Sequence, residues 1–169
     1  MKRRSRATRW AVTTGLCACV LGMLLVSAQA NSGTGVATCG EDMTIAYAPT
    51  TLWPPNNKMS TITITATDTD QEPSGETFSI TVVSISSNED DAAGNSTCGR
   101  PSGPDWAGVG NSATGTDDTT AAVTTISLRN ERCGIGTGRV YTITLSCADA
   151  ETPTGTTTLT VTVPHDKGH

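Results

Sequence analysis

The chain has 169 residues, of which 11 are basic and 16 are acidic. All 16 acidic residues follow Ala30 but only six basic ones do, so the part after Ala30 has a net charge of −10. This balance argues against nucleic acid or anionic lipid as a partner, because binding phosphates requires a concentrated basic surface. Charged residues make up 16% of the chain, against about 25% in typical domains. The abundant threonine and glycine favour β-strands joined by turns.

The first 30 residues have the three parts of a secretory signal peptide. A basic stretch at residues 2–9 precedes an apolar run at 15–26, and Ala28-Gln29-Ala30 provides small residues for a peptidase site. We therefore predict cleavage after Ala30 and a secreted, extracellular protein with no membrane span after cleavage. A retained anchor is the alternative, but the apolar run is shorter than the roughly 20 residues of a comfortable span.

The rest of the chain alternates apolar and polar residues at period two, which is typical of half-buried strands. In chain order, the predicted strands cover residues 43–48, 60–66, 78–85, 123–129, 141–147 and 159–163. The inner faces of five of these strands carry Ile62, Ile64, Phe78, Ile80, Val82, Ile126, Leu128, Tyr141, Ile143, Leu145, Cys147, Leu159, Val161 and Val163. In the strand at 78–85 the phase slips, which predicts a β-bulge near Val82-Val83 that aligns Val83 with Ile85.

A long segment at 87–120, rich in glycine, serine, aspartate and asparagine, separates the third and fourth of these strands. It is expected to contain a short strand at about 106–109, and a loop of this length is either functional or disordered. Six to seven short strands predict an all-β fold, a single antiparallel Ig-like β-sandwich. The domain covers 42–166, after an N-terminal segment at 31–41 and before a polar tail at 167–169.

Three motifs, in a fixed order along the chain, resemble a known family. The first is Leu52-Trp53-Pro54-Pro55-Asn56-Asn57-Lys58-Met59. The second is Leu128-Arg129-Asn130-Glu131-Arg132 with glycines at 134, 136 and 138, and the third is Val161-Thr162-Val163-Pro164-His165-Asp166. Together they resemble the Ig-like, hyalin-repeat-like domains of secreted and surface proteins of bacteria, over about residues 43–166. The resemblance implies a module for interaction or structural support outside the cell.

Four cysteines remain after the signal peptide: Cys39, Cys98, Cys133 and Cys147. An even number in an oxidising compartment predicts two disulfides. In an Ig-type topology, Cys39 before the first strand and Cys147 at the end of the strand at 141–147 share one end of the sandwich. Cys98 and Cys133 share the other end, so we predict the pairs Cys39–Cys147 and Cys98–Cys133. A zinc site of four thiolates is the rival, but these residues have no Cys-x-x-Cys spacing.

The sequence contains few candidate catalytic residues or motifs. The only histidines, His165 and His169, lie at the C-terminal end, where little would hold an imidazole in register. The chain has neither a phosphate-binding Gly-Lys-Ser/Thr loop nor a His-Glu-x-x-His motif. We therefore predict that the protein is not an enzyme, with hydrolysis by two carboxylates as the remaining alternative.

Carboxylates in two loops predict a calcium site, although no cofactor is required for the predicted function. The loops after the strands at 60–66 and 141–147 share one end of the sandwich, and carboxylate oxygens suit calcium. The candidate ligands are Asp68, Asp70, Glu72, Asp149 and Glu151. The alternative is a solvated acidic rim, which is ordinary for exposed loops. At the opposite end, Glu89-Asp90-Asp91 is expected to pair with Arg129, Arg132 and Arg139.

The function predicted from these features is a non-catalytic Ig-like interaction or structural module at the cell surface or outside the cell. Its expected partner is another extracellular protein or a cell-surface glycan. A calcium-stabilised adhesion module and a carbohydrate-binding accessory module are the alternatives. The latter needs an exposed aromatic platform, and Trp106 in the long segment is the best candidate for one.

Overall fold

Strands make up all of the regular structure in the part of the chain that the computed structural model describes, residues 31–68, 75–89, 104–117, 120–134, 136–149 and 155–166. No helix long and apolar enough to cross a membrane occurs in these ranges. The strands are β1 (Gly35–Cys39), β2 (Met43–Ala48), β3 (Met59–Asp68), β4 (Thr77–Ser87), β5 (Trp106–Ala107), β6 (Ser112–Thr116), β7 (Ala122–Arg129), β8 (Gly138–Ala148) and β9 (Gly155–Pro164).

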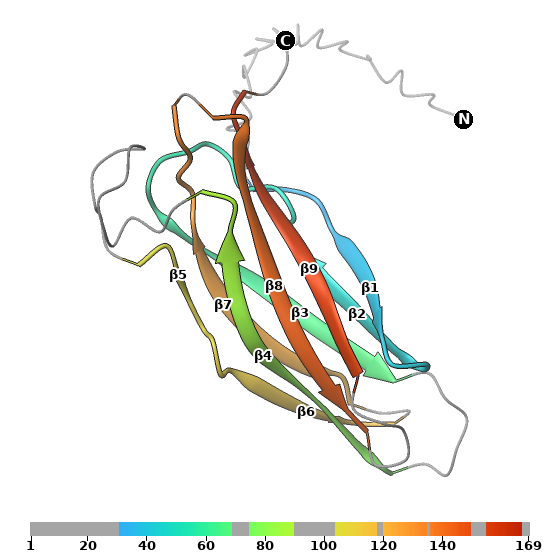
Figure 1. Cartoon of the computed structure of the whole chain (residues 1–169). Coiled ribbons are helices and arrows are strands. Elements are labelled where there is room, and N and C mark those ends of the chain that lie inside the picture. The colour runs from blue at the N-terminus through green and yellow to red at the C-terminus, as the bar shows by residue number, and fades with distance from the viewer. Residues whose placement is uncertain are drawn as a thin grey trace, which may run out of the picture.

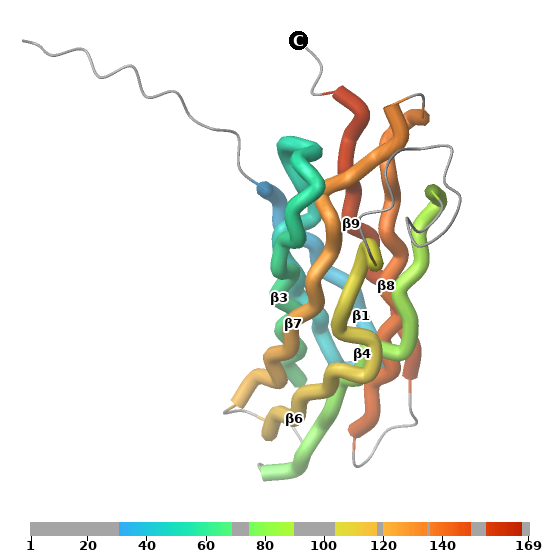
Figure 2. The backbone as a smooth tube through the Cα atoms, turned by 90° about the vertical axis from the view of Figure 1, so that its left-hand side faces the viewer, coloured from blue at the N-terminus to red at the C-terminus, as the bar shows by residue number. Residues whose placement is uncertain are grey.

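Two antiparallel sheets form the two layers of a β-sandwich (Figures 1 and 2). The first has the strand order β1-β2-β3-β7-β5, and the second has the order β6-β4-β8-β9. Each of the predicted strands, including the short one near Trp106, corresponds to a strand of these sheets. The predicted all-β sandwich is therefore confirmed.

Two strands, β1 and β6, were not predicted. β1 lies within the predicted N-terminal segment at 31–41, and β6 lies within the long segment at 87–120. Both are edge strands of five residues with few buried side chains, so neither has an apolar face long enough to give a periodic signal. β5 pairs with β7 and β6 pairs with β4, so this stretch crosses from one sheet to the other and closes that side of the sandwich (Figure 2).

The core lies between the sheets and contains every residue predicted for the inner faces. In β4 the register with β8 shifts between Val82 and Ser84, which confirms the predicted bulge. The prediction for Val83 is wrong: its side chain is 51% exposed, whereas Ile85 is buried. The bulge therefore turns Val83 outward and brings only Ile85 back to the core.

The opposite side of the sandwich is closed by the segment after β2. Thr51 forms a parallel bridge with Thr162 of β9. The amide of Leu52 donates to the carbonyl of Thr162 at 2.8 Å, and the amide of Thr162 donates to the carbonyl of Thr50 at 2.9 Å. These bonds satisfy backbone groups on the outer edge of β9, which would otherwise be open to another strand.

Candidate functional site

Charged residues are almost absent from the strands. In the nine described strands they are Asp68, Arg129 and Arg139, and each lies at or near the end of its strand. The other described charged residues lie in the connections, so the two ends of the sandwich carry the charge. The two ends differ in the sign of their charges and in how these charges are paired.

The first end, which we call the ion-pair end, is built around Arg139 near the start of β8. Its side chain is 1% exposed, although guanidinium groups are rarely buried without a partner. The Arg139 guanidinium pairs with the carboxylate of Asp105, which is fully buried. The same guanidinium lies 3.2 Å from the Glu89 carboxylate and 3.2 Å from the hydroxyl of Tyr141. The buried charge is therefore both paired and hydrogen-bonded, as burial requires.

Asp105 joins Arg139 to a second arginine. The Nε of Arg129 lies 3.2 Å from Oδ1 of Asp105, and the Arg129 amide donates to the Asp105 carbonyl at 2.8 Å. The remaining Arg129 nitrogens donate to the carbonyls of Pro104 and Asn57, each at 2.9 Å. Arg129 thus ties together the chain before β5, the end of β7 and the turn before β3.

Glu89 connects this cluster to the turn between β7 and β8. Its Oε2 accepts the Cys133 amide at 2.7 Å and the Nε of Arg139 at 3.2 Å. The ion pair expected between the run at 89–91 and an arginine is thus present for Glu89 with Arg139. Asp90 and Asp91 lie outside the described residues. Arg129 was expected to join this run, but it pairs with Asp105 and Glu131 instead.

Protonation at this end follows from burial and hydrogen bonding. Burial disfavours the charged form of Arg139, but the hydrogen bonds to Asp105 and Tyr141 outweigh it and raise the pKa of the guanidinium. Burial also disfavours the charged form of the Tyr141 phenol, and this raises its pKa to about 12. Its hydroxyl donates to the Arg129 carbonyl at 2.8 Å. At neutral pH the cluster therefore contains a charged arginine and a neutral tyrosine.

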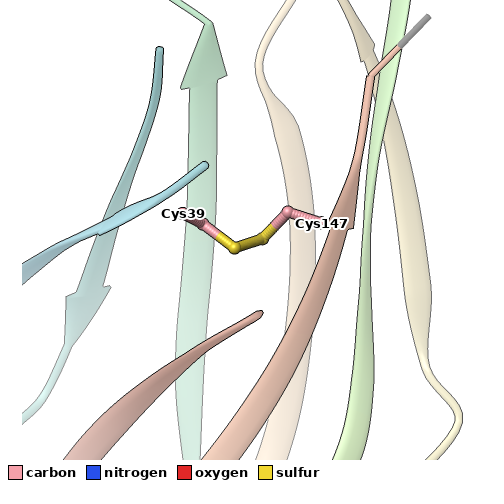
Figure 3. Close-up of a disulfide and its surroundings, with 2 residues drawn as sticks. All are labelled: Cys39 and Cys147. Carbon is pink, nitrogen blue, oxygen red and sulfur yellow. A yellow bond between two sulfur atoms is a disulfide. The ribbon is translucent and has the colours of Figure 1, made fainter. Parts of the chain in front are cut away.

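The second end contains the predicted disulfide between Cys39 and Cys147 (Figure 3). Their Cα atoms are 6.2 Å apart, and the bond joins the last residue of β1 to β8 in the other sheet. Cys133 is also disulfide-bonded. Cys98, its predicted partner, lies outside the described residues, so the pair Cys98–Cys133 stays a prediction.

Two of the five predicted calcium ligands lie beside this disulfide. Asp68 at the end of β3 and Asp149 just after β8 line one small cavity, together with Cys39, Cys147 and Gly155. The predicted proximity of these two loops is therefore correct for their described residues. Asp70, Glu72 and Glu151 lie outside the described ranges, and within those ranges no three His, Cys, Asp or Glu residues form a group that could hold a metal ion.

The charged residues described at this end are all acidic, so we call it the acidic end. They lie in or beside the connections β1–β2, β3–β4, β6–β7 and β8–β9, at the bottom of Figure 1. They are Glu41, Asp42, Asp68, Glu76, Asp117 and Asp149. The ion-pair end, in contrast, contains the described basic residues Lys58, Arg129, Arg132 and Arg139. The charge of the chain is therefore strongly asymmetric along the strands.

Small uncharged side chains cover the outer faces of both sheets. In β3 the outward residues between Met59 and Asp68 are threonines, and in β9 the residues at 156, 158 and 160 are exposed threonines. A shallow depression lies on the outer face of the five-stranded sheet, lined by residues 31–34, Ala48, Pro49, Thr61 and Thr63. These faces can offer hydroxyl and methyl groups to a partner but no charge.

The proposed aromatic platform is not free. Trp106 is partly buried, packs against the core, and meets the Tyr141 ring edge-on with 6.4 Å between the ring centroids. His165 is also engaged, because its Nδ1 lies 2.6 Å from the Asp166 carboxylate and its Nε2 lies 2.9 Å from the Gly134 carbonyl. His169 lies outside the described residues.

Comparison with known proteins adds no family. No protein-family model matches the chain, and no curated protein or solved structure gives a significant match.

The sequence analysis missed the central role of Arg139 and Asp105. Arg139 has the same odd-numbered phase as the inward-facing residues Tyr141 and Ile143, and that signal indicates an inward arginine.

Proposed function

We propose that the exported protein is a non-catalytic Ig-like module that acts in interaction or structural support outside the cell, at the cell surface. The observation that carries this proposal is the separation of charge from the sheet faces. The described charged side chains lie at the two ends of the sandwich, and Glu89, Asp105, Arg129 and Arg139 form ion pairs at the ion-pair end. The surfaces left for contact are broad, uncharged sheet faces, which suit a partner surface better than a small substrate.

Two features support the Ig-like assignment. The orders β2-β3-β7-β5 and β4-β8-β9 are those of strands A-B-E-D and C-F-G in constant-type immunoglobulin domains. Tyr141, near the start of the strand equivalent to F, donates its hydroxyl hydrogen bond to the Arg129 carbonyl. Immunoglobulin sandwiches also have a tyrosine at this corner that bonds an upstream backbone group, although Tyr141 and Cys147 are farther apart in sequence than the tyrosine and the second cysteine of antibody domains.

An extracellular protein fits as partner better than a glycan does. Glycan sites rely on exposed aromatic rings, and Trp106 is engaged with Tyr141 and the core. Export is part of the proposal, because the disulfide between Cys39 and Cys147 requires an oxidising compartment to persist.

Fractionation and cell binding test this proposal. The full chain expressed in a secreting bacterium should appear outside the cytoplasm with Asn31 as its first residue. Labelled purified protein should then bind intact cells saturably, and unlabelled protein should compete. Recovery in the cytoplasm with residues 1–30 attached would contradict export. Binding that rises linearly with concentration and resists competition would contradict the interaction role.

A calcium-stabilised adhesion module is a second candidate, favoured by one observation. Asp68 and Asp149, from two loops distant in sequence, line the same cavity at an end whose described charged residues are all acidic. A divalent cation would reduce the repulsion there, and calcium accepts irregular carboxylate coordination more readily than magnesium, which demands a near-ideal octahedron.

A further inference from the structure

The residues directly after the predicted cleavage site are bound to the sandwich, although they precede β1. The Ser32 amide donates to the Thr51 carbonyl at 2.9 Å, and the Thr51 amide donates to the Ser32 carbonyl at 2.8 Å. The Thr50 amide donates to the Gly33 carbonyl at 3.1 Å. Because Thr51 also bridges to β9, residues 31–34 pair with the segment that closes the outer edge of β9. We call residues 31–34 the strap.

The Asn31 side chain anchors the first residue of the strap. Its Nδ2 donates to Oγ of Ser60 at 2.7 Å. Its Oδ1 accepts hydrogen bonds from the Trp53 amide at 2.8 Å and from Nδ2 of Asn130 at 3.2 Å. Asn130 is 3% exposed, and Asn31 is the only described residue that hydrogen-bonds its side chain. Asn31 thus links β3, the connection before β3 and the residue after β7.

The strap also requires a glycine at position 33. Gly33 has a φ of +88°, in the left-handed region where other residues are strained. A Cβ at this position would in addition contact the Thr50 side chain. An extended chain imposes neither restriction, because the β region is open to all residues. A substitution of Gly33 therefore disfavours the docked strap without disfavouring the extended chain.

The bond cut in the proposed export, between Ala30 and Asn31, directly adjoins the docked strap. A peptidase holds its substrate in an extended form on both sides of the bond that it cuts. It can therefore act on a folded chain only in the fraction of molecules whose strap is open. Six hydrogen bonds hold the strap, and each favours closure by a factor of about five before the entropy of ordering is subtracted. We expect the strap to be open in at most about one tenth of the molecules.

We propose that docking of the strap and cleavage after Ala30 exclude each other, so that the leader must be removed before the domain folds. The peptidase that acts on this chain then takes an extended, unfolded substrate, and a precursor that folds first keeps residues 1–30. Docking after cleavage completes the backbone pairing beside β9 and protects the new N-terminus from further trimming. This order of steps rests on the proposed export.

Cleavage of the full-length precursor, residues 1–169, by a purified signal peptidase in detergent micelles tests this order. One sample is folded with its disulfides formed, and the other is reduced and freshly diluted from urea. Mass spectrometry measures the rate at which the product that begins with Asn31 appears. The folded precursor should be cleaved at least about tenfold more slowly than the unfolded one. The ratio of the two rates corrects for any effect of a substitution on the peptidase itself.

Variants of the strap should raise the cleavage rate of the folded precursor relative to that of the unfolded one. Asn31→Ala removes three hydrogen bonds and should raise this ratio about fivefold or more. Ser60→Ala removes one of them and should raise the ratio about two- to fivefold. Gly33→Ala strains the docked strap and should raise the ratio about fivefold. The matched controls are Ser84→Ala, on the outer face of β4, and Gly40→Ala, at a glycine of positive φ between β1 and β2. Each should change the ratio by less than about twofold.

Two results would overturn the proposed order while leaving export intact: equal cleavage rates of the folded and unfolded precursor, or an equal response to Gly33→Ala and Gly40→Ala. The second result would assign the protection to the stability of the whole domain rather than to the strap. Absence of cleavage after Ala30 in both samples would contradict export itself, and the order with it. Circular dichroism and an intact Cys39–Cys147 pair must first show that each folded sample is folded.

Discussion

Arg139 and Asp105 form an ion pair in the interior of the sandwich, where the arginine is 1% exposed and the aspartate is fully buried. The two residues join β8 of one sheet to the chain just before β5 of the other. Glu89 binds the same guanidinium from the end of β4. One side chain therefore connects three chain segments that are distant in sequence.

Removal of this arginine is expected to be costly. Arg139→Met leaves the buried Asp105 carboxylate without its principal partner, and we expect a loss of about 3–5 kcal/mol in the free energy of unfolding. Asp105→Asn in the Arg139→Met background should recover part of that loss, because it removes the uncompensated charge. Urea unfolding of the two single variants and the double variant measures the coupling between them. Additive losses would show that the two side chains stabilise the fold independently.

The strands were predictable because alternation at period two records which side chains face the core. The residues from Ile62 to Val163 expected on inner faces are buried for this reason. β1 and β6 were not predictable, because each strand buries too few side chains to produce a periodic pattern in the sequence. The alternation in β8 indicates that Arg139 faces inward, but its partner Asp105 precedes β5, a strand of only two residues. That pairing depends on tertiary contacts that no local pattern encodes.

The candidate site was predictable to a similar extent. The proximity of Asp68 and Asp149 followed from the order of the strands, which fixes the connections that share an end. The pair Cys39–Cys147 followed from the same reasoning. The exposure of the Val83 side chain could not be predicted. The position of a bulge predicts a change of phase but does not show which residue is turned outward.

Loss of the observed disulfide should destabilise the protein through the unfolded state. The bond closes a sequence separation of 108 residues, and the chain-entropy model assigns about 4–5 kcal/mol to a loop of that size. Cys39→Ser with Cys147→Ser should therefore lower the free energy of unfolding by about 2–5 kcal/mol. Circular dichroism should show that the double variant keeps its strands. The double variant avoids a free thiol that could exchange with Cys133.

Peptide mapping without reduction should recover the observed pair of Cys39 with Cys147 and the predicted pair of Cys98 with Cys133. A link between Cys98 and any other cysteine would contradict the predicted position of the long segment at 87–120. It would not affect the observed bond between the two sheets.

Calcium is expected to stabilise the acidic end by binding only the folded state. At the affinity of extracellular modules, a few millimolar calcium would add roughly 1–2 kcal/mol to the free energy of unfolding, and magnesium would add less. Asp68→Asn with Asp149→Asn should abolish the gain. Glu41→Gln with Glu76→Gln removes the same charge from the same end without altering the cavity, and should preserve most of the gain. Equal melting temperatures with calcium and with chelator, at matched ionic strength, would contradict a calcium site.

His165 is expected to make stability depend on pH near neutrality. Its two ring nitrogens face the Gly134 carbonyl and the Asp166 carboxylate, which both accept hydrogen bonds, so only the imidazolium can donate to both. The hydrogen bond to Gly134, followed by that to Asp166, raises the pKa of His165 above its ordinary value, although desolvation and the charge of Arg132 oppose the shift.

Because the folded-state pKa is the higher one, the stabilisation is complete below the unfolded value of about 6.5 and is lost as pH rises through the folded-state pKa. The melting temperature of the folded protein should therefore fall as pH rises across this window. His165→Gln should remove that part of the pH dependence, and Asp166→Asn should reduce it. A melting curve with the same pH dependence in His165→Gln would assign the effect to other groups. NMR titration of the imidazole protons would then give the folded-state pKa directly, and a value at or below the unfolded one would contradict the proposed hydrogen bonds.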